Sequence, residues 1–241
     1  MPITWNQAEA DRVIHQEQPF KEQECNQYFD DITTNYTDRN ISIVMNAAKQ
    51  GDTEAQLELA KRYEQGNGVP KSDREAVEWI VEAAHQHNAL AQVYLGACYS
   101  DGHVVPQDDN QAFKWFFASA EQGCADAQCM LGLCYTAGIG TTENEEEALK
   151  WYTKAAEQNY SVAQFELGWY YEDVVQDYVL AVDWYSKAAN QGDKDAQYAL
   201  GLCYYNGKGV RIDYDRAFGL IKQAAAQGNE EAIKFAKKHN L

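Results

Sequence analysis

One short phrase recurs at almost constant spacing and constrains the fold more than any other feature of this chain. It reads AQVYLGACYSDG from Ala91, AQCMLGLCYTAG from Ala127 and AQYALGLCYYNG from Ala196. The alanine that opens the phrase recurs with gaps of 36, 36, 36, 33 and 36 residues, at Ala55, Ala91, Ala127, Ala163, Ala196 and Ala232. A fixed period of this length is typical of an array in which similar structural units stack on one another.

Each period contains the pattern of two amphipathic helices. In the phrase, apolar or small residues recur at offsets 0, 4, 5 and 8, which form one face of an α-helix that we name helix A. A second frame, helix B, opens at Ala76, Ala112, Ala148, Ala181 and Ala217 and carries a tryptophan, or finally Leu220, three residues later. A single pair buries too little apolar surface to be stable, so neighbouring pairs must stack.

Glycines separate the helices. We expect Gly66, Gly138 and Gly207 to end helix A in the left-handed conformation, and Gly51, Gly123, Gly192 and Gly228 to form the turn after helix B. The Gly-x-Gly between helices A and B never extends into a phosphate-binding motif. Val104 replaces the second loop glycine of its unit, which we expect to be a mild change. The unit around Tyr171 is three residues shorter and has no loop glycine, so its turn must differ.

The pattern Ala-x-x-x-Leu-Gly-x-x-Tyr, Gly-x-Gly, Ala-x-x-Trp and Ala-Ala resembles the Sel-one-like (Sel1-like) repeat family, which is related to tetratricopeptide repeats. The resemblance covers about residues 41–241. It implies an all-α fold, a right-handed α-solenoid of about five helix-turn-helix repeats whose A helices line a concave face. We expect one solenoid domain over residues 39–241, closed by a capping helix in EEAIKFAKKHNL. Residues 1–38 do not repeat, and we expect them to form an acidic cap or a flexible arm.

The charge of the chain narrows the class of partner. Its 37 acidic and 20 basic residues give a formal net charge of −17, which repels nucleic acid and anionic membranes and suits a basic protein. Alternatively, the charge serves solubility alone. The amino terminus lacks the pattern of a secretory signal, and no stretch reaches the roughly 20 apolar residues of a membrane span, so we expect a cytoplasmic, monomeric protein without membrane contact.

No group of residues has the pattern of a catalytic or metal site. Cys98, Cys134 and Cys203 each precede the tyrosine of the repeated phrase, which favours buried thiols over disulfides or metal ligands. The His85-Gln86-His87 pair is expected in an exposed turn, and the acidic clusters precede B helices, where they stabilise the helix start. We therefore predict no enzymatic activity, no cofactor and no metal. A hydrolase remains a remote alternative.

Candidate binding residues lie in the columns of helix A that vary between units. The glutamine after the opening alanine is repeated and is expected to be a framework hydrogen-bonding residue. The variable columns become aromatic and acidic toward the carboxyl terminus, as an interface hot spot requires. The predicted partner-binding residues are Asp101, Leu133, Phe165, Trp169, Glu172, Asp173, Tyr198 and Tyr205. The alternative is that Trp169 and the column of Phe165 and Tyr198 only pack against neighbouring helices.

These patterns, together with the family resemblance, predict a protein-protein interaction module whose acidic and aromatic concave face binds a basic protein. The most concrete form is an immunity or inhibitor protein for a toxin or effector. The alternative is a general adaptor scaffold for complex assembly or signalling. The sequence leaves open the partner, the choice between inhibitor and adaptor, whether residues 1–38 are ordered, and whether the concave or the convex face binds.

Overall fold

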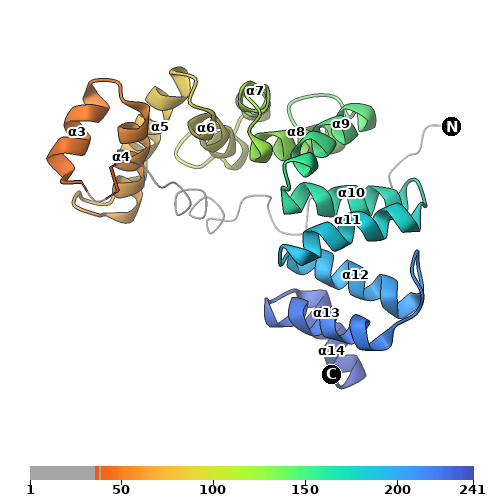
Figure 1. Ribbon diagram of the computed structural model, residues 1–241. Helices are drawn as coiled ribbons and strands as arrows, with labels where there is room; N and C mark the ends of the chain where they lie inside the picture. Colours follow the sequence, from red (N-terminus) through yellow and green to blue (C-terminus); the bar gives the residue numbers. More distant parts are fainter. Residues whose placement is uncertain (1–35, 38) are drawn as a thin grey trace. The chain divides into compact units, whose positions relative to one another are not determined.

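The computed structural model describes residues 36, 37 and 39–241, and every regular element within them is an α-helix (Figure 1). The predicted amino-terminal cap or arm and Cys25 lie outside the described residues, apart from the segment just before the first helix. The chain divides into two compact units. The first ends at Glu145 and the second comprises Glu146–Leu241, and each is described by itself.

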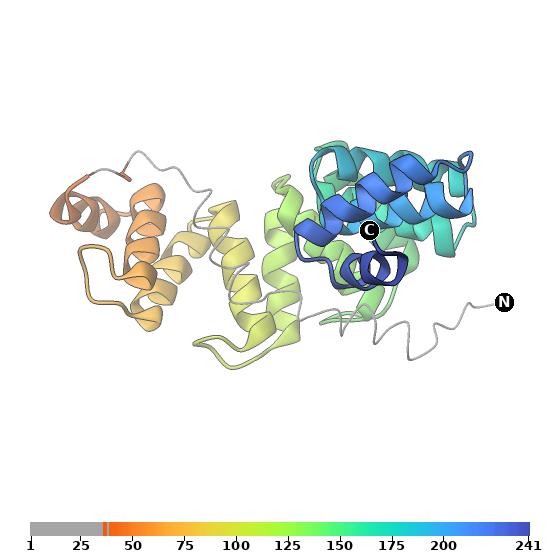
Figure 2. The same ribbon diagram turned by 90° about the horizontal axis from the view of Figure 1, so that it is seen from below.

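The helices of the first unit alternate between type B and type A. They are α3 (Ile41–Lys49), α4 (Thr53–Gln65), α5 (Asp73–His85), α6 (Ala89–Asp101), α7 (Asp109–Ala120) and α8 (Ala125–Ala137). Each helix from α3 to α8 packs against the next along the chain. The views in Figures 1 and 2 agree on this order of neighbouring helices.

The second unit continues the alternation. It holds α9 (Glu145–Glu157), which begins at the boundary, then α10 (Ser161–Asp173), α11 (Tyr178–Asn190), α12 (Lys194–Asn206), α13 (Tyr214–Ala226) and α14 (Glu230–His239). From α10 to α14 each helix packs against the next. The last is the predicted closing A-type helix, with Lys234, Lys237 and Lys238 exposed. The predicted all-α solenoid of helix pairs is thereby confirmed.

Side chains before the first turn fix where most helices begin. Asp52, Ser72, Asn88 and Asn229 each accept a hydrogen bond from a backbone N–H three residues later, which satisfies an otherwise unpaired donor of the helix start. Asp108 caps α7 through Gln111 N–H at 3.1 Å. The predicted helix-start role of this acidic residue is confirmed.

The turns use the left-handed conformation where glycine was predicted. Gly66, Gly138 and Gly207 end helices A with φ between 69° and 73°. Val104 also adopts φ 64°, where its β-branched side chain is strained, so replacing the loop glycine is a less mild change than the sequence suggested. At the end of α10, Val174 stays right-handed and Gln176 takes φ 59°, so this turn differs from the others as expected.

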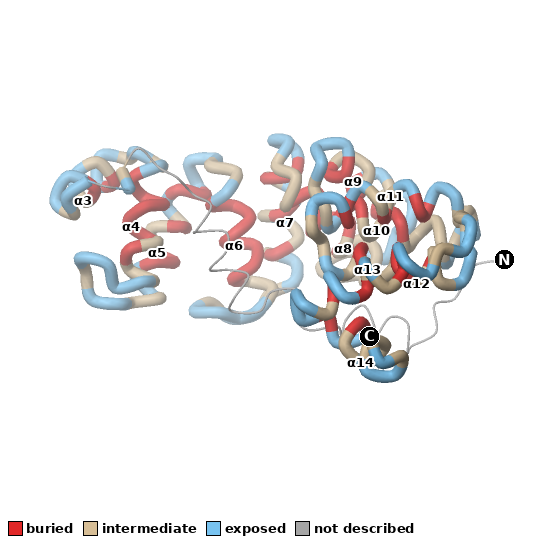
Figure 3. The backbone as a smooth tube through the Cα atoms, turned by 60° about the horizontal axis from the view of Figure 1, so that its bottom comes forward, coloured by how far each residue is buried: buried red, intermediate tan, exposed pale blue. Residues whose placement is uncertain are grey.

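Helices A and B pack closely where a helix B side chain lies against the glycine of the preceding helix A. A Cβ built on Gly96 would lie 2.7 Å from the Phe116 ring, and one on Gly168 would lie 2.5 Å from the Tyr185 ring. These residues follow the predicted tryptophan column by one position. Trp151 is buried, but Trp115 is only half-buried, so the tryptophan is not the central packing residue in every repeat. Buried segments mark the helix faces that meet within each unit (Figure 3).

The repeated glutamine joins neighbouring helices by a buried hydrogen bond. In every case Nε2 donates to the carbonyl oxygen of an alanine eight residues earlier, at 3.1–3.5 Å, in the pairs Gln56–Ala48, Gln92–Ala84, Gln128–Ala120, Gln164–Ala156 and Gln197–Ala189. The Oε1 atom of Gln164 accepts from Gln191 Nε2 at 2.8 Å, so both ends of its amide are used. The predicted framework role of this glutamine is confirmed.

Substituting Gly168 tests the close helix contact. Gly168→Ala should lower the free energy of unfolding by about 1–3 kcal/mol, because the added methyl group forces the buried Tyr185 ring out of its position. Gly219→Ala is the matched control, since a Cβ there meets no atom within 4 Å and alanine favours the helix by about 0.5–1 kcal/mol. Urea denaturation of both variants measures the difference. Equal stability of the two variants would contradict the packing described.

Candidate functional site

The two predicted aromatic residues of α10 are half-buried on the same helix. Phe165 and Trp169 both pack against the core cluster that α11 and α12 form around Tyr185 and Leu200. The rings of Phe165 and Tyr185 are tilted, with centroids 5.8 Å apart. Both predicted residues therefore support the core on one side and retain exposed area on the other.

The two predicted tyrosines of α12 pack toward the end of the second unit. Tyr198 is half-buried against a cluster of Ile221 and Ala232 from α13 and α14. The ring of Tyr205, also half-buried, lies among four others, with centroid distances of 5.3–6.1 Å to Phe235, Tyr214, His239 and Phe218. The predicted aromatic strip is thus two groups with different neighbours, one on α10 and one on α12.

The two acids at the end of α10 have different surroundings. Glu172 accepts a hydrogen bond from the Tyr185 hydroxyl at 3.1 Å and pairs with Lys208 Nζ at 2.9 Å, so part of its charge is already neutralised within the chain. This contact also raises the pKa of Lys208. Asp173 is exposed. Of the two, Asp173 is the more exposed to solvent.

The remaining two predicted residues belong to the first unit. Asp101 is the last residue of α6 and is exposed, and Leu133 lies half-buried on α8. Both belong to A helices, as the repeat pattern predicts. They are candidates for a surface of the first unit in their own right.

Glu166 is a candidate that the sequence analysis missed. It is partly buried on α10, next to Phe165, and burial together with the negative charges of Asp193 and Asp195 raises its pKa to about 7. In the first unit the same column holds Glu58, which pairs with Arg62 at 2.7 Å. The residue four positions after Glu166 is Tyr170 instead of arginine, a difference that comparison of the columns could have revealed.

Asp193 and Asp195 belong to the start of α12. Asp193 accepts hydrogen bonds from the backbone N–H groups of Asp195 and Ala196 as the helix cap, and burial raises its pKa. Asn229 donates from Nδ2 to Asp195 Oδ1 at 2.6 Å. We define the acidic group as Glu166, Asp193 and Asp195. It concentrates negative charge between α10 and the start of α12.

The cysteines of the repeated phrase are buried. Cys134 and Cys203 are buried free thiols, 2% exposed, and burial raises the pKa of each to about 12, which makes them poor nucleophiles. Cys98 is buried to the same extent. Across residues 36–37 and 39–241, no three histidine, cysteine or acidic side chains gather where they could hold a metal ion. Within the same ranges, every helix is too short or too polar to cross a membrane.

The repeat frame identifies the family. The Sel1 repeat matches residues 53–88, 89–124, 125–160, 161–193 and 194–229. The chain belongs to the Sel1 repeat family. These five Sel1 repeats each open at the first residue of a helix A, so the family boundaries coincide with the structural repeat.

Solved Sel1 repeat structures resemble this one. A Sel1 repeat protein from Oxalobacter formigenes is 35% identical, with a TM-score of 0.76 over 81% of this chain and 79% of that one. A protective antigen of uropathogenic Escherichia coli with an SLR fold is 33% identical, with a TM-score of 0.73 over 92% of this chain. The match covers 50% of the antigen, so this chain spans about half of its length.

A third structure shares the fold at lower identity. An immunity protein from Pseudomonas aeruginosa is 22% identical, with a TM-score of 0.57 over 100% of this chain and 90% of that one. At this identity the likeness establishes the fold alone. A search of curated proteins found no match to the sequence.

The raised pKa of Glu166 predicts a pH-dependent stability. The unfolded carboxyl titrates near 4.5 and the folded one at about 7, so ionising Glu166 in the folded state is costly and stability falls as the pH rises through this window. Glu166→Gln removes this loss. At pH 8 the variant should be more stable than the parent by about 1–3 kcal/mol, and at pH 4.5 the two should differ little. Chemical denaturation at both pH values measures the effect.

Glu75→Gln provides the control, because Glu75 is exposed on α5 and should change stability little at either pH. If Glu166→Gln left the pH dependence of the parent unchanged, the carboxyl would not be held in the surroundings described.

Proposed function

We propose that this protein is a non-enzymatic binding module for a basic protein, which it contacts through helices α10 and α12. Sel1 repeats generally mediate protein-protein interaction, which supports the class of function. The observation that carries the proposal is the association of half-buried aromatic side chains with the acidic group on these two helices. Phe165, Trp169 and Tyr198 supply apolar area, and Glu166 supplies an adjacent carboxyl whose pKa is already raised.

Electrostatics favours a cationic partner. An arginine or lysine placed beside Glu166 would lower the pKa of its carboxyl and offset the repulsion from Asp193 and Asp195. The net charge of −17 also steers positively charged proteins toward the chain. Exposed Asp173 would act mainly during the encounter, because a charge in water is screened more strongly than one partly buried.

We propose an immunity or inhibitor role as the concrete form of this activity. The shared fold with an immunity protein from Pseudomonas aeruginosa supports it, as does the acidic composition, which suits the masking of a basic toxin or effector. In this role the protein acts as a cytoplasmic monomer. A general adaptor scaffold is the second candidate, supported by the family alone. An inhibitor abolishes the activity of its partner, whereas an adaptor leaves that activity intact.

Substitution of Trp169 tests the binding surface. After affinity capture with the full chain and identification of the bound protein, the purified partner is titrated by calorimetry. Trp169→Ala should weaken binding by about 2 kcal/mol, or about thirtyfold, because a half-buried ring at the contact is removed. Trp184→Ala is the matched control, since Trp184 is half-buried on α11 beneath Lys187 in the same unit. The control should bind like the parent.

A second variant keeps the test decisive if Trp169→Ala loses its fold. Asp173→Lys changes an exposed side chain, so folding should persist while association slows, and added salt should reduce the difference from the parent. Parent-like affinity in a folded Trp169→Ala protein, or parent-like association of Asp173→Lys at low salt, would contradict the proposed surface.

A further inference from the structure

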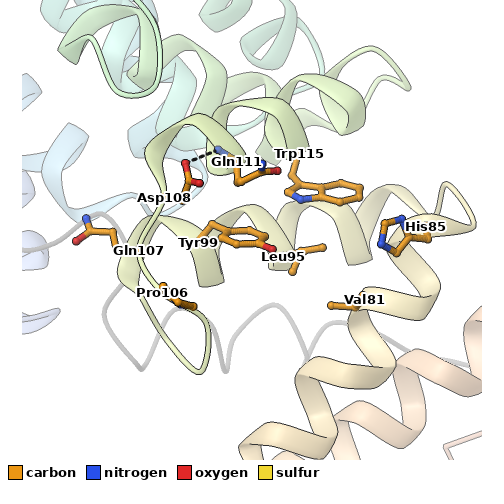
Figure 4. Close-up of a pocket in the computed structure, with 9 residues that line it drawn as sticks. All are labelled: Val81, His85, Leu95, Tyr99, Pro106, Gln107, Asp108, Gln111 and Trp115. Atoms are coloured by element: carbon orange, nitrogen blue, oxygen red, sulfur yellow. Dashed lines mark hydrogen bonds between the residues drawn. The ribbon is translucent and has the colours of Figure 1, made fainter.

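An open pocket is formed by residues of the first unit alone, whereas the proposed α10 and α12 surface belongs to the second unit. It has a volume of about 420 Å³ and is lined by side chains of α5, α6, α7 and the loop before α7 (Figure 4). Trp115 of α7 and Tyr99 of α6 supply aromatic walls, and the carboxyl of Asp108 lies on the same lining. His85, Pro106 and Gln107 are exposed, so the pocket is accessible from solvent. We name it the Trp115 pocket.

Two other repeats place a lysine over the tryptophan of the same column. Lys154 Nζ lies 3.6 Å from the centroid of the Trp151 ring, and Lys187 Nζ lies 3.7 Å from that of Trp184. In both cases the lysine follows the tryptophan by three residues on helix B. The negative potential of an indole face attracts a cation at this distance, so the fold itself demonstrates a cation-binding geometry at this column.

The repeat that contains Trp115 lacks this internal cation. The residue three positions after Trp115 is Ala118. Lys114 precedes Trp115 and therefore occupies the same column as Lys150, whose Nζ lies 6.0 Å from the centroid of the Trp151 ring. Lys114 does not line the pocket. The Trp115 ring instead meets His85 edge-on, with centroids 5.4 Å apart and an interplanar angle of 77°.

The carboxyl of Asp108 adds the charge that a cation requires. Its Oδ1 atom accepts from Gln111 N–H at 3.1 Å, which fixes the side chain at the start of α7. Figure 4 shows this hydrogen bond, with Tyr99 and Trp115 as further members of the lining. An aromatic wall with a fixed carboxylate is a chemical complement of a guanidinium or ammonium group.

We propose that the Trp115 pocket binds one arginine or lysine side chain of the protein partner. This side chain takes the place of the lysine that two other repeats have at the position of Ala118. The identity of the occupant rests on the proposed function, because the arginine or lysine side chain would come from the basic protein that this chain is proposed to bind. Charge complementarity and the internal Lys–Trp pairs of two other repeats select a cationic side chain over an apolar one. The pocket is then a second anchor, formed within the first unit alone.

A small probe tests the pocket without the partner. The ¹⁵N-labelled full chain is titrated with N-acetyl-arginine amide, and the indole N–H signals are followed by NMR, with the Trp115 signal assigned from Trp115→Phe. The Trp115 signal should move in a saturable way, and those of Trp151 and Trp184 should not, because Lys154 and Lys187 already lie over their rings. The uncharged N-acetyl-citrulline amide should move the Trp115 signal little.

Two substitutions of Ala118 separate charge from bulk. Ala118→Lys recreates the arrangement of Trp151 and should weaken probe binding by about fivefold or more, because the introduced lysine competes for the ring face. Ala118→Met has a similar length without charge and should bind within about twofold of the parent. The same pair of variants is then compared for binding of the purified partner.

The outcomes distinguish this site from the proposed function. Absence of a saturable Trp115 shift, an equal shift with citrulline, or equal losses in Ala118→Lys and Ala118→Met would overturn the pocket proposal. Probe binding with the expected pattern, together with parent-like partner affinity in Ala118→Lys, would overturn its use by the partner. A parent-like affinity of folded Trp169→Ala would instead refute the α10 and α12 surface and leave the probe result standing.

Discussion

The close contact between a helix B side chain and the glycine of helix A is the interaction on which each unit depends. Tyr185 lies against Gly168, and Phe116 lies against Gly96, at distances that leave no room for a methyl group. On its other side the same helix A is joined to the preceding helix, because a glutamine such as Gln164 donates to the carbonyl oxygen of Ala156. Each repeat thus combines apolar packing with one buried hydrogen bond.

This arrangement separates the residues that support the fold from those available for binding. The residues that support the fold are the small residues at the helix contacts, the repeated glutamine and the helix B residue that follows the tryptophan column. The other columns of helix A vary between repeats. In the second unit those columns carry Phe165, Trp169 and Tyr198, each half-buried and each in contact with the core. Their support from the core limits side-chain freedom, which reduces the entropy lost when a partner binds.

Much of the fold follows from the period. The helix pairs, the left-handed glycines at Gly66 and Gly138, and the framework role of Gln164 could all be predicted, because each depends on local pattern and recurs. The strain at Val104 was underestimated, since the sequence shows the replaced glycine but not the backbone conformation that the loop retains. The position of Tyr185 was missed because tryptophan is the more prominent residue of the helix B pattern.

The candidate site was less accessible to sequence reasoning. Glu172 was expected on the rim, but Lys208, thirty-six residues later, pairs with it, and no local pattern indicates such a contact. The pKa of Glu166 is raised by burial and by the negative charges of Asp193 and Asp195, which come near Glu166 only when the chain folds. Residues 1–38 lack the repeat, so the period gave no basis for choosing between a cap and an arm.

The central claim is that the partner covers helices α10 and α12 while the repeat frame remains unchanged. Backbone hydrogen exchange, read by mass spectrometry on the full chain with and without its captured and purified partner, tests this most directly. We predict added protection concentrated in Ser161–Asp173 and Lys194–Asn206, with α11 and α13 changed little. Added protection confined to the B helices or to residues 1–38, with α10 and α12 unchanged, would contradict the account.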